Sequence, residues 1–397
     1  MTIAIIGAGL AGASAAEELR NAGYDGDITL VGAEPHAPYE RPPLSKDILL
    51  RTGTAEDALV HEAEWYAQQR IELLTGTRVS DLDPAARTFA VDGRRISYDQ
   101  LLLATGATSR HLPMADDSGA PVVHLRTIEE AEALRNHLSG ALLVIGAGWI
   151  GLEVASAARQ AGGTVTVVES ASTPLAGPLG TQLASLFTDL HREHGVDLRT
   201  DTSVISIEHD AHGTRARLSD GDEVHPSVIL VAIGAEPQVS LAADAGLAVD
   251  SGILVDARLC TSDPHVYAAG DVANHDHPSL GRLRVEHWDA AIHQGRHAAR
   301  SMLGGQEPYG RQPYFFTDQY DLGMEYVGHR GPDVDEVIVR GDRERRVINA
   351  VWLREGRVVA GMHTNDWDAI DPLRAWIGRQ ATPALRDTTT SLADALG

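Results

Sequence analysis

Two short glycine-rich segments of this chain have the spacing of loops that bind dinucleotide phosphates. The first contains Gly7, Gly9 and Gly12 and directly follows the apolar run 3–6. In such a loop the first glycine permits a tight turn, the second lets the backbone approach a pyrophosphate, and the third lets the next helix pack against the strand. Backbone amides at the start of that helix can then bind the phosphates.

The second segment repeats the pattern with Gly146, Gly148 and Gly151. A carboxylate lies about 20 residues after each segment, Glu34 after the first and Glu169 after the second. In dinucleotide-binding folds a carboxylate at this position binds a ribose hydroxyl. Two such loops indicate two dinucleotides. The usual pair is a flavin and a nicotinamide dinucleotide, with a hydride passed between them. We therefore expect FAD and a nicotinamide cofactor.

Each loop must be held by parallel strands and a helix. The predicted fold class is α/β, with two Rossmann-like dinucleotide-binding domains, one inserted in the other. Beyond residue 308 the alternating pattern favours a C-terminal α+β domain with an antiparallel sheet. The expected boundaries are 1–108 and 236–307 for a discontinuous FAD-binding domain, 109–235 for the NAD-binding domain, and 308–397 for a C-terminal interface domain.

Composition narrows the class of partner. The net charge of −23 disfavours nucleic acid and anionic membranes. A strand that begins at residue 3 leaves no room for a cleaved targeting peptide, so we expect a cytoplasmic protein. The single cysteine, Cys260, excludes an intrachain redox disulfide and a cysteine-held iron–sulfur cluster. Electrons that leave the flavin must therefore reach an external acceptor.

A resemblance joins these features. The segment Tyr39-Glu-Arg41-Pro-Pro-Leu-Ser-Lys46 resembles the signature of the FAD-dependent ferredoxin reductases that serve Rieske oxygenases and bacterial cytochromes P450. These enzymes have a glutathione-reductase-like fold, and the resemblance covers essentially the whole chain. It implies FAD contacts from Arg41, Lys46, Thr105, Gly106, Arg110, Gly270, Asp271, Trp288 and Phe316. On the nicotinamide side it implies contacts from Glu153, Gly234, Glu286 and His287.

Glu153 is unusual because it lies near the start of an otherwise apolar helix. A buried carboxylate needs a cationic partner or a raised pKa. The resemblance implies that Lys46 is the partner and that this pair acts in catalysis beside the flavin and nicotinamide. The alternative is that Glu153 caps the first helical turn.

Two segments bear on the surroundings of the flavin and on the choice of nicotinamide cofactor. Phe316 and Thr317 stand where the family has Trp and Ser, which keeps an aromatic ring but removes the indole N–H. After Glu169, residues 170–173 contain no Arg or Lys that could bind a 2′-phosphate. We therefore expect NADH rather than NADPH.

The leading interpretation is an NADH-dependent, FAD-containing reductase of a [2Fe–2S] ferredoxin. A rubredoxin or quinone reductase and an NADH oxidase are the enzyme alternatives. A non-enzymatic alternative is an NADH-responsive binding protein similar to apoptosis-inducing factor. For ferredoxin docking the sequence offers a basic run formed by Arg340, Arg343, Arg345 and Arg346. The second choice is the group of basic residues near Trp288, which are Arg282, Arg284 and Arg296.

The histidines give little indication of a metal site. His191 and His194 could be taken for a metal pair, but no third ligand is in view, so solvated or core positions are favoured. His275 and His277 are expected to be solvated in a polar loop. No metal site is predicted.

Overall fold

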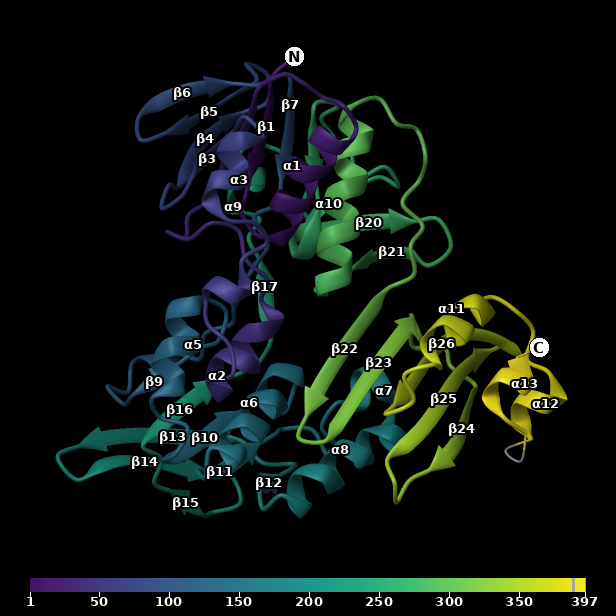
Figure 1. Ribbon diagram of the computed structural model, residues 1–397. Helices are drawn as coiled ribbons and strands as arrows, with labels where there is room; N and C mark the ends of the chain where they lie inside the picture. The colour runs from purple at the N-terminus through teal and green to yellow at the C-terminus, as the bar shows by residue number, and fades with distance from the viewer. Residues whose placement is uncertain (388–389, 397) are drawn as a thin grey trace. The chain divides into compact units, whose positions relative to one another are not determined.

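The computed structural model describes residues 1–387 and 390–396, and the chain divides into two compact units (Figure 1). Unit 1 comprises residues 1–40, 56–108 and 236–314. Unit 2 comprises residues 41–55 and 109–235 and the described residues from 315 onward. Among the described residues, no helix is both long and apolar enough to cross a membrane.

Unit 1 is built on a five-stranded parallel sheet whose inner strands are buried and rich in Ile, Leu and Val, as expected for strands covered on both faces. In sheet order these strands are β19 (Val266–Ala268), β7 (Gln100–Leu103), β1 (Ile3–Ile6), β2 (Ile28–Val31) and β3 (Ile71–Leu74). Helix α1 (Leu10–Asn21) lies beside α10 (Trp288–Met302). A Cβ on Gly295 would lie 2.2 Å from the carbonyl oxygen of Ala11, so only glycine allows this close packing.

The other elements of unit 1 are short. Two three-stranded sheets consist of β4 (Val79–Asp83), β5 (Thr88–Val91) and β6 (Arg94–Ser97), and of β18 (Ile253–Val255), β20 (Ala273–His277) and β21 (Gly281–Arg284). The remaining helices are η2 (Glu56–Ala58), α3 (Ala63–Gln68), α9 (Ser240–Asp244) and η3 (Gly270–Val272). Two of the boundaries between the units, after residues 108 and 235, fall within β8 (Ala107–Ser109) and β17 (Ala235–Pro237).

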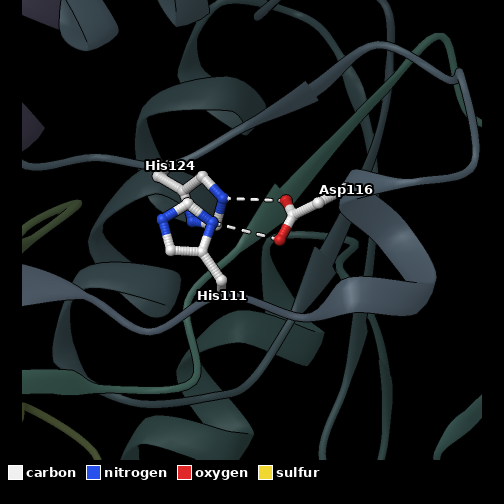
Figure 2. Close-up of side chains that lie close together, drawn as sticks. All are labelled: His111, Asp116 and His124. Atoms are coloured by element: carbon white, nitrogen blue, oxygen red, sulfur yellow. Dashed lines mark hydrogen bonds and ion pairs between the residues drawn. The ribbon is translucent and has the colours of Figure 1, made fainter.

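Unit 2 repeats the parallel architecture around the second glycine loop. Its sheet has the order β12 (Asp197–Arg199), β11 (Thr164–Val168), β10 (Ala141–Ile145), β16 (Val228–Val231) and β9 (Val122–Val123). The helices of this part are η1 (Pro42–Ser45), α2 (Asp47–Leu50), α4 (Pro113–Asp116), α5 (Ile128–Arg135), α6 (Trp149–Gln160), α7 (Ala176–Leu179) and α8 (Thr181–Glu193). A smaller sheet contains β13 (Val204–Asp210), β14 (Gly213–Leu218) and β15 (Glu223–Val224). Beside α4 and β9, the side chains of His111, Asp116 and His124 lie together (Figure 2).

The C-terminal part of unit 2 is an antiparallel sheet that contains the fully buried Trp352. Its order is β22 (Tyr314–Gln319), β23 (Leu322–Gly328), β26 (Arg357–Thr364), β25 (Val347–Arg354) and β24 (Glu336–Asp342). Helices α11 (Ile370–Trp376), α12 (Pro383–Arg386) and α13 (Leu392–Leu396) follow. The predicted fold class, two parallel α/β sheets and a C-terminal antiparallel sheet, is confirmed.

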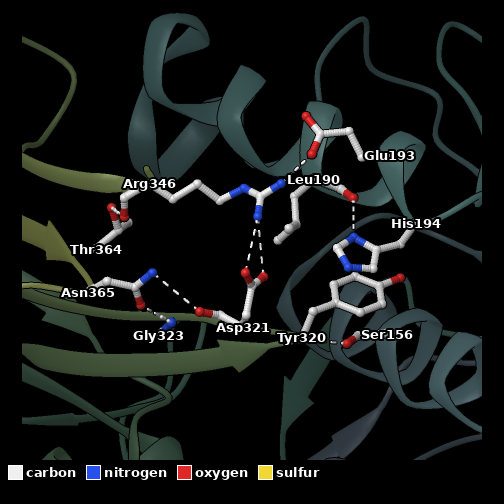
Figure 3. A network of polar contacts seen from close by, with 10 residues as sticks. All are labelled: Ser156, Leu190, Glu193, His194, Tyr320, Asp321, Gly323, Arg346, Thr364 and Asn365. Carbon is white, nitrogen blue, oxygen red and sulfur yellow. Dashed lines mark hydrogen bonds and ion pairs between the residues drawn. The ribbon is translucent and has the colours of Figure 1, made fainter. Parts of the chain in front are cut away.

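Ion pairs connect this antiparallel sheet to α8. Arg346 contacts Glu193 on α8 and Asp321 in the β22–β23 turn, as Figure 3 shows. Arg343 reaches Asp189 on α8 at 2.9 Å. Arg343 and Arg346, at the β24–β25 turn, therefore serve contacts within the unit.

Two expectations from the sequence are wrong. His275 and His277 are buried on β20, because this strand pairs with β18 and β21 and the His275 ring meets Tyr309 at a centroid distance of 5.5 Å. Arg340 does not belong to an exposed basic run. Its guanidinium is buried and donates to backbone carbonyls of Leu385 and Asp387.

Candidate functional site

The first glycine loop, at the carboxyl end of β1, has the backbone geometry expected of a phosphate-binding turn. Gly7 has a φ of +115°, and a Cβ there would lie 2.0 Å from the carbonyl oxygen of Ala104. A Cβ on Gly12 would lie equally close, 2.0 Å, to the carbonyl oxygen of Gly7. At Gly9 a Cβ would meet nothing within 4 Å, and no side chain caps α1 there. Open space and uncapped helix amides fit a pyrophosphate.

The second loop, at the end of β10, repeats this geometry. Gly146 has a φ of +102°, and a Cβ on Gly151 would lie 2.2 Å from the carbonyl oxygen of Gly146. Gly148 faces open space and forms the N-cap of α6, again without a side-chain cap. Both loops therefore fit dinucleotides on their own backbone geometry.

The carboxylate that follows each loop is held in place. In unit 1, Glu34 follows β2 and accepts a hydrogen bond from the Tyr39 hydroxyl. In unit 2, Glu169 follows β11 and accepts from the backbone amides of Ala147, at 2.8 Å, and Ala171, at 2.9 Å. Because Ala147 belongs to the glycine loop, Glu169 lies where a ribose bound at this loop would meet it.

The cation on the strand next to Glu169 is already paired with carboxylates. Arg199 ends the neighbouring strand β12, and its backbone carbonyl accepts from the Glu169 amide. Its guanidinium is bound by three carboxylates, those of Asp197, Asp220 and Asp222. Glu169 therefore has no free positive partner from this strand.

The predicted pair of Lys46 and Glu153 is present in unit 2. Lys46 Nζ lies 2.8 Å from Glu153 Oε2, and the Glu153 side chain is only 4% exposed. Helix α6 begins at Trp149 and has no acidic residue in its first turn, so Glu153 lies too far along to cap it. The pairing is confirmed, and the capping alternative is wrong.

Two hydroxyl groups complete the surroundings of the Glu153 carboxylate. Ser45 Oγ donates to Oε2 at 2.5 Å, and Thr317 Oγ1 donates to Oε1 at 2.6 Å. Each carboxylate oxygen thus has a donor. This satisfies the requirement that a buried charge be both paired and hydrogen-bonded.

A further chain of side chains supports Thr317. Gln319 Nε2 donates to Thr317 Oγ1 at 3.1 Å, and His191 Nε2 lies 2.8 Å from Gln319 Oε1. Burial lowers the pKa of His191 to about 4, so the ring is neutral near pH 7 and donates to the amide oxygen. His194 instead stacks on Tyr320 at a centroid distance of 3.7 Å (Figure 3). These two histidines therefore have separate partners: His191 lies in the core, and His194 is half-buried against Tyr320.

Sequence reasoning missed Ser45, Gln319 and His191 as supports of Glu153. One signal was available, because residues 317 and 319 of a strand point to the same face. Their partners lie far away in the sequence, and only the fold brings them together.

Phe316 and Asp318 lie on the same strand, β22. Lys46 Nζ is 5.5 Å from the centroid of the Phe316 ring, within the range of a cation–π contact. Burial raises the pKa of the Asp318 carboxyl, with Lys46 opposing and Glu153 reinforcing that shift. The ring that replaces the family's Trp thus adjoins the Lys46–Glu153 pair.

Two predicted arginines also belong to unit 2. Arg41 donates to the backbone carbonyl of Arg126. Arg110 binds the glycine turn after β16, because its backbone amide donates to the Gly234 carbonyl at 2.9 Å and its Nε donates to the Ala235 carbonyl at 3.2 Å.

The remaining predicted flavin residues belong to unit 1. Thr105 Oγ1 donates to the carbonyl of Gln238 at 2.8 Å, and the Gly106 carbonyl accepts from the Gln238 amide at 2.9 Å. Gly270 opens η3 and lies against α1, since a Cβ there would be 3.0 Å from the Ala11 Cβ. The fold therefore brings Gly270 to the first glycine loop.

The segment before α10 connects further predicted residues. Arg284 donates to the Asp271 backbone carbonyl at 3.0 Å and forms an ion pair with Glu286. His287 is the N-cap residue of α10, and Trp288 is its first residue. Glu286, His287 and Trp288 are thus placed at the start of the helix that packs on α1.

Comparison with known proteins gives a consistent set of relatives. The family described as pyridine nucleotide-disulphide oxidoreductase matches residues 1–295, and the family described as reductase C-terminal matches residues 314–396. The ferredoxin–NAD(+) reductase component of the anthranilate 1,2-dioxygenase system of Burkholderia cepacia is 39% identical over 98% of this chain and 97% of its own length.

Two solved structures are also similar along their lengths. The covalent putidaredoxin reductase–putidaredoxin complex matches with a TM-score of 0.94 and 33% identity, over 100% of this chain and 98% of that one. The ferredoxin reductase for the CYP199A2 system of Rhodopseudomonas palustris matches with a TM-score of 0.94 and 34% identity, over 100% of both chains.

Proposed function

Because this chain belongs to the pyridine nucleotide-disulphide oxidoreductase family, we propose that it is an NADH-dependent, FAD-containing reductase of a [2Fe–2S] ferredoxin. The relatives named above serve a dioxygenase system and partner a putidaredoxin. The ferredoxin would feed a Rieske oxygenase or a cytochrome P450. The proposal includes the division into FAD-binding, NAD-binding and C-terminal interface domains.

The observation that carries this proposal is the pair of complete dinucleotide loops in a chain without a redox disulfide. Cys260 is buried, and burial raises the pKa of its thiol, which disfavours the reactive thiolate. Disulfide chemistry within the chain is therefore excluded despite the family's name. The fitting reaction takes a hydride at one dinucleotide and releases electrons to an external acceptor.

The residues have distinct roles in this reaction. FAD, when bound, would accept the hydride and release electrons singly. The α1 and α6 amides would bind the two pyrophosphates, and Glu34 and Glu169 would bind the riboses. Lys46, fixed by Glu153, would present a localised positive charge from a site that is largely protected from water. Ser45 and Thr317 would keep the Glu153 carboxylate oriented.

We also propose that the protein is cytoplasmic. The proposed use of NADH, which is available in the cytosol, supports this location.

The test is NADH-driven reduction of cytochrome c with purified protein and a panel of acceptors. A [2Fe–2S] ferredoxin from an oxygenase system should raise the rate by at least about tenfold over the reductase alone. Rubredoxin and a soluble quinone are run in parallel. A larger kcat/KM with rubredoxin or quinone than with ferredoxin would show that ferredoxin is not the preferred acceptor. Slow oxidation by every acceptor would instead favour an NADH-responsive binding protein.

A further inference from the structure

We propose that His111, Asp116 and His124 form a binding site for a divalent transition-metal ion of the zinc type. Figure 2 shows the three side chains close together. One ligand atom from each lies within 4.8 Å of the others. His111 precedes α4, Asp116 is its last residue, and His124 directly follows β9. The three come from one short stretch of unit 2, so the fold alone assembles them.

The spacing between each histidine and the Asp116 carboxylate is close to the spacing of ligand atoms in a metal site. His111 Nδ1 and His124 Nε2 each lie 3.1 Å from a different oxygen of the Asp116 carboxylate. In a tetrahedral zinc site with bonds of about 2.0–2.1 Å, neighbouring ligand atoms are about 3.3–3.4 Å apart. The two imidazole rings are tilted by 54° to each other at a centroid distance of 4.4 Å.

The donor set selects the class of metal. Two imidazoles and one carboxylate suit zinc and its neighbours, whereas calcium and magnesium prefer oxygen ligands alone. Three protein ligands leave a position for water or another small ligand. The His111 side chain is 65% exposed, which gives an ion direct access from solvent.

The surroundings predict moderate affinity. On metal binding each imidazole keeps one proton, on the nitrogen that faces away from the ion. For His124 this nitrogen is Nδ1, which is buried without a hydrogen-bond partner among the described residues. A partner at that position usually strengthens metal binding by about 10–100-fold. We therefore expect weaker binding than at structural zinc sites.

The site is separate from the proposed electron-transfer reaction. None of its three residues is assigned to FAD or the nicotinamide cofactor. The competing explanation is that the two histidines only hydrogen-bond Asp116 and fix the segment 111–124. A metal-binding measurement distinguishes the two, and it does not depend on ferredoxin activity.

The experiment uses full-length protein without a histidine tag, stripped with a chelator and dialysed. Zinc is titrated by calorimetry, and thermal unfolding is recorded with and without zinc. Cobalt absorption reports the coordination geometry. Wild type should bind one ion per chain at this site, with a rise in the unfolding temperature. His111→Ala and Asp116→Asn should each weaken this binding by at least about tenfold and remove the temperature rise.

The control is His137→Ala, which removes an exposed histidine of the same unit outside the cluster. It is needed because the chain has 18 histidines that can bind zinc weakly. Zinc binding and stabilisation that are equal in wild type and His111→Ala would overturn the proposal, as would a wild type that binds no zinc. Because His111 is largely exposed, its loss should leave the fold intact.

Discussion

At the scale of single residues, the central observation is the concentration of partners around Glu153. One ion pair and two hydroxyl hydrogen bonds hold its buried carboxylate, from Lys46, Ser45 and Thr317. That Glu153 needs a cationic partner or a raised pKa was predictable from its place in an apolar helix, whereas Lys46 was identified as the partner through the resemblance to the family. Thr317 could be recognised only as a departure from the family's Ser, since its contact with Glu153 joins residues far apart in the sequence. A threonine keeps the hydroxyl that the serine would supply.

Replacing Lys46 tests the role of the pair. Lys46→Met removes the charge and leaves Glu153 buried without its cation, which costs about 3–5 kcal/mol of stability in comparable cases. We expect hydride transfer from NADH to FAD, measured by stopped flow, to slow by at least about tenfold. FAD retention should change much less.

The matched controls separate charge from packing. Lys46→Met with Glu153→Gln should recover stability but not the rate, because the charge is still missing. Thr317→Ser should preserve both, since the hydroxyl donor remains. Hydride transfer in Lys46→Met at the wild-type rate would show that the pair is structural only.

At the scale of elements, the strand ends next to the glycine loops decide the cofactor. Glu169 after β11 carries a negative charge, and Arg199 at the end of β12 is occupied by three carboxylates. A 2′-phosphate would meet repulsion without compensation. We expect kcat/KM with NADH to exceed that with NADPH by at least about a hundredfold. Comparable values for the two cofactors would refute the assignment.

The buried histidines of β20 and α8 predict a dependence of stability on pH. Burial lowers the pKa values of His275 and His191 to about 4, below the value of about 6.5 in an unfolded chain. Between these pH values the unfolded state binds more protons. Stability is therefore complete above about pH 6.5 and falls as the pH drops toward 4.

Urea unfolding at pH 7 and pH 5 measures this effect. The free energy of unfolding should be lower at pH 5, and His275→Gln should reduce the difference by on the order of 1 kcal/mol. His212→Ala, at an exposed histidine, serves as the control and should leave the difference unchanged. A pH dependence in His275→Gln equal to that of wild type would contradict the interpretation.

The elements also show where sequence reasoning stops. Apolar runs and glycine spacing were sufficient for β1, β10 and their loops, because that information is local. The burial of His275 was not predictable, since β20 is short and polar in sequence and becomes an inner strand only through β18 and β21. Arg340 was misplaced for the same reason, as its partners are carbonyls at the C-terminal end of the chain.

At the scale of the whole molecule, net charge governs the encounter with a ferredoxin. The chain carries −23, and ferredoxins of this class are generally acidic, so the two repel at long range. The basic run suggested by the sequence is not a patch. Arg340 is buried, Arg343 and Arg346 are ion-paired, and only Arg345 has an exposed side chain without a partner among the described residues.

The alternative arginines near Trp288 are likewise engaged in unit 1. Arg282 binds backbone carbonyls, Arg284 binds Glu286, and Arg296 binds Glu17. We therefore expect Arg345→Glu to change the apparent KM for ferredoxin by less than about twofold, as one exposed charge contributes little. Ferricyanide reduction, which needs no protein docking, is the control. If Arg345→Glu raised the KM for ferredoxin several-fold and left the KM for ferricyanide unchanged, the β24–β25 turn would again be the candidate docking surface.

The most direct test of the central claim is anaerobic double-mixing stopped flow. The protein is first reduced with one equivalent of NADH and then mixed with an oxidised [2Fe–2S] ferredoxin. Ferredoxin reduction and flavin reoxidation should proceed together, with two ferredoxins reduced per NADH and a rate that rises with ferredoxin concentration until it saturates. A flavin that stays reduced in the presence of ferredoxin, or a second protein acceptor that reoxidises it faster, would contradict the account.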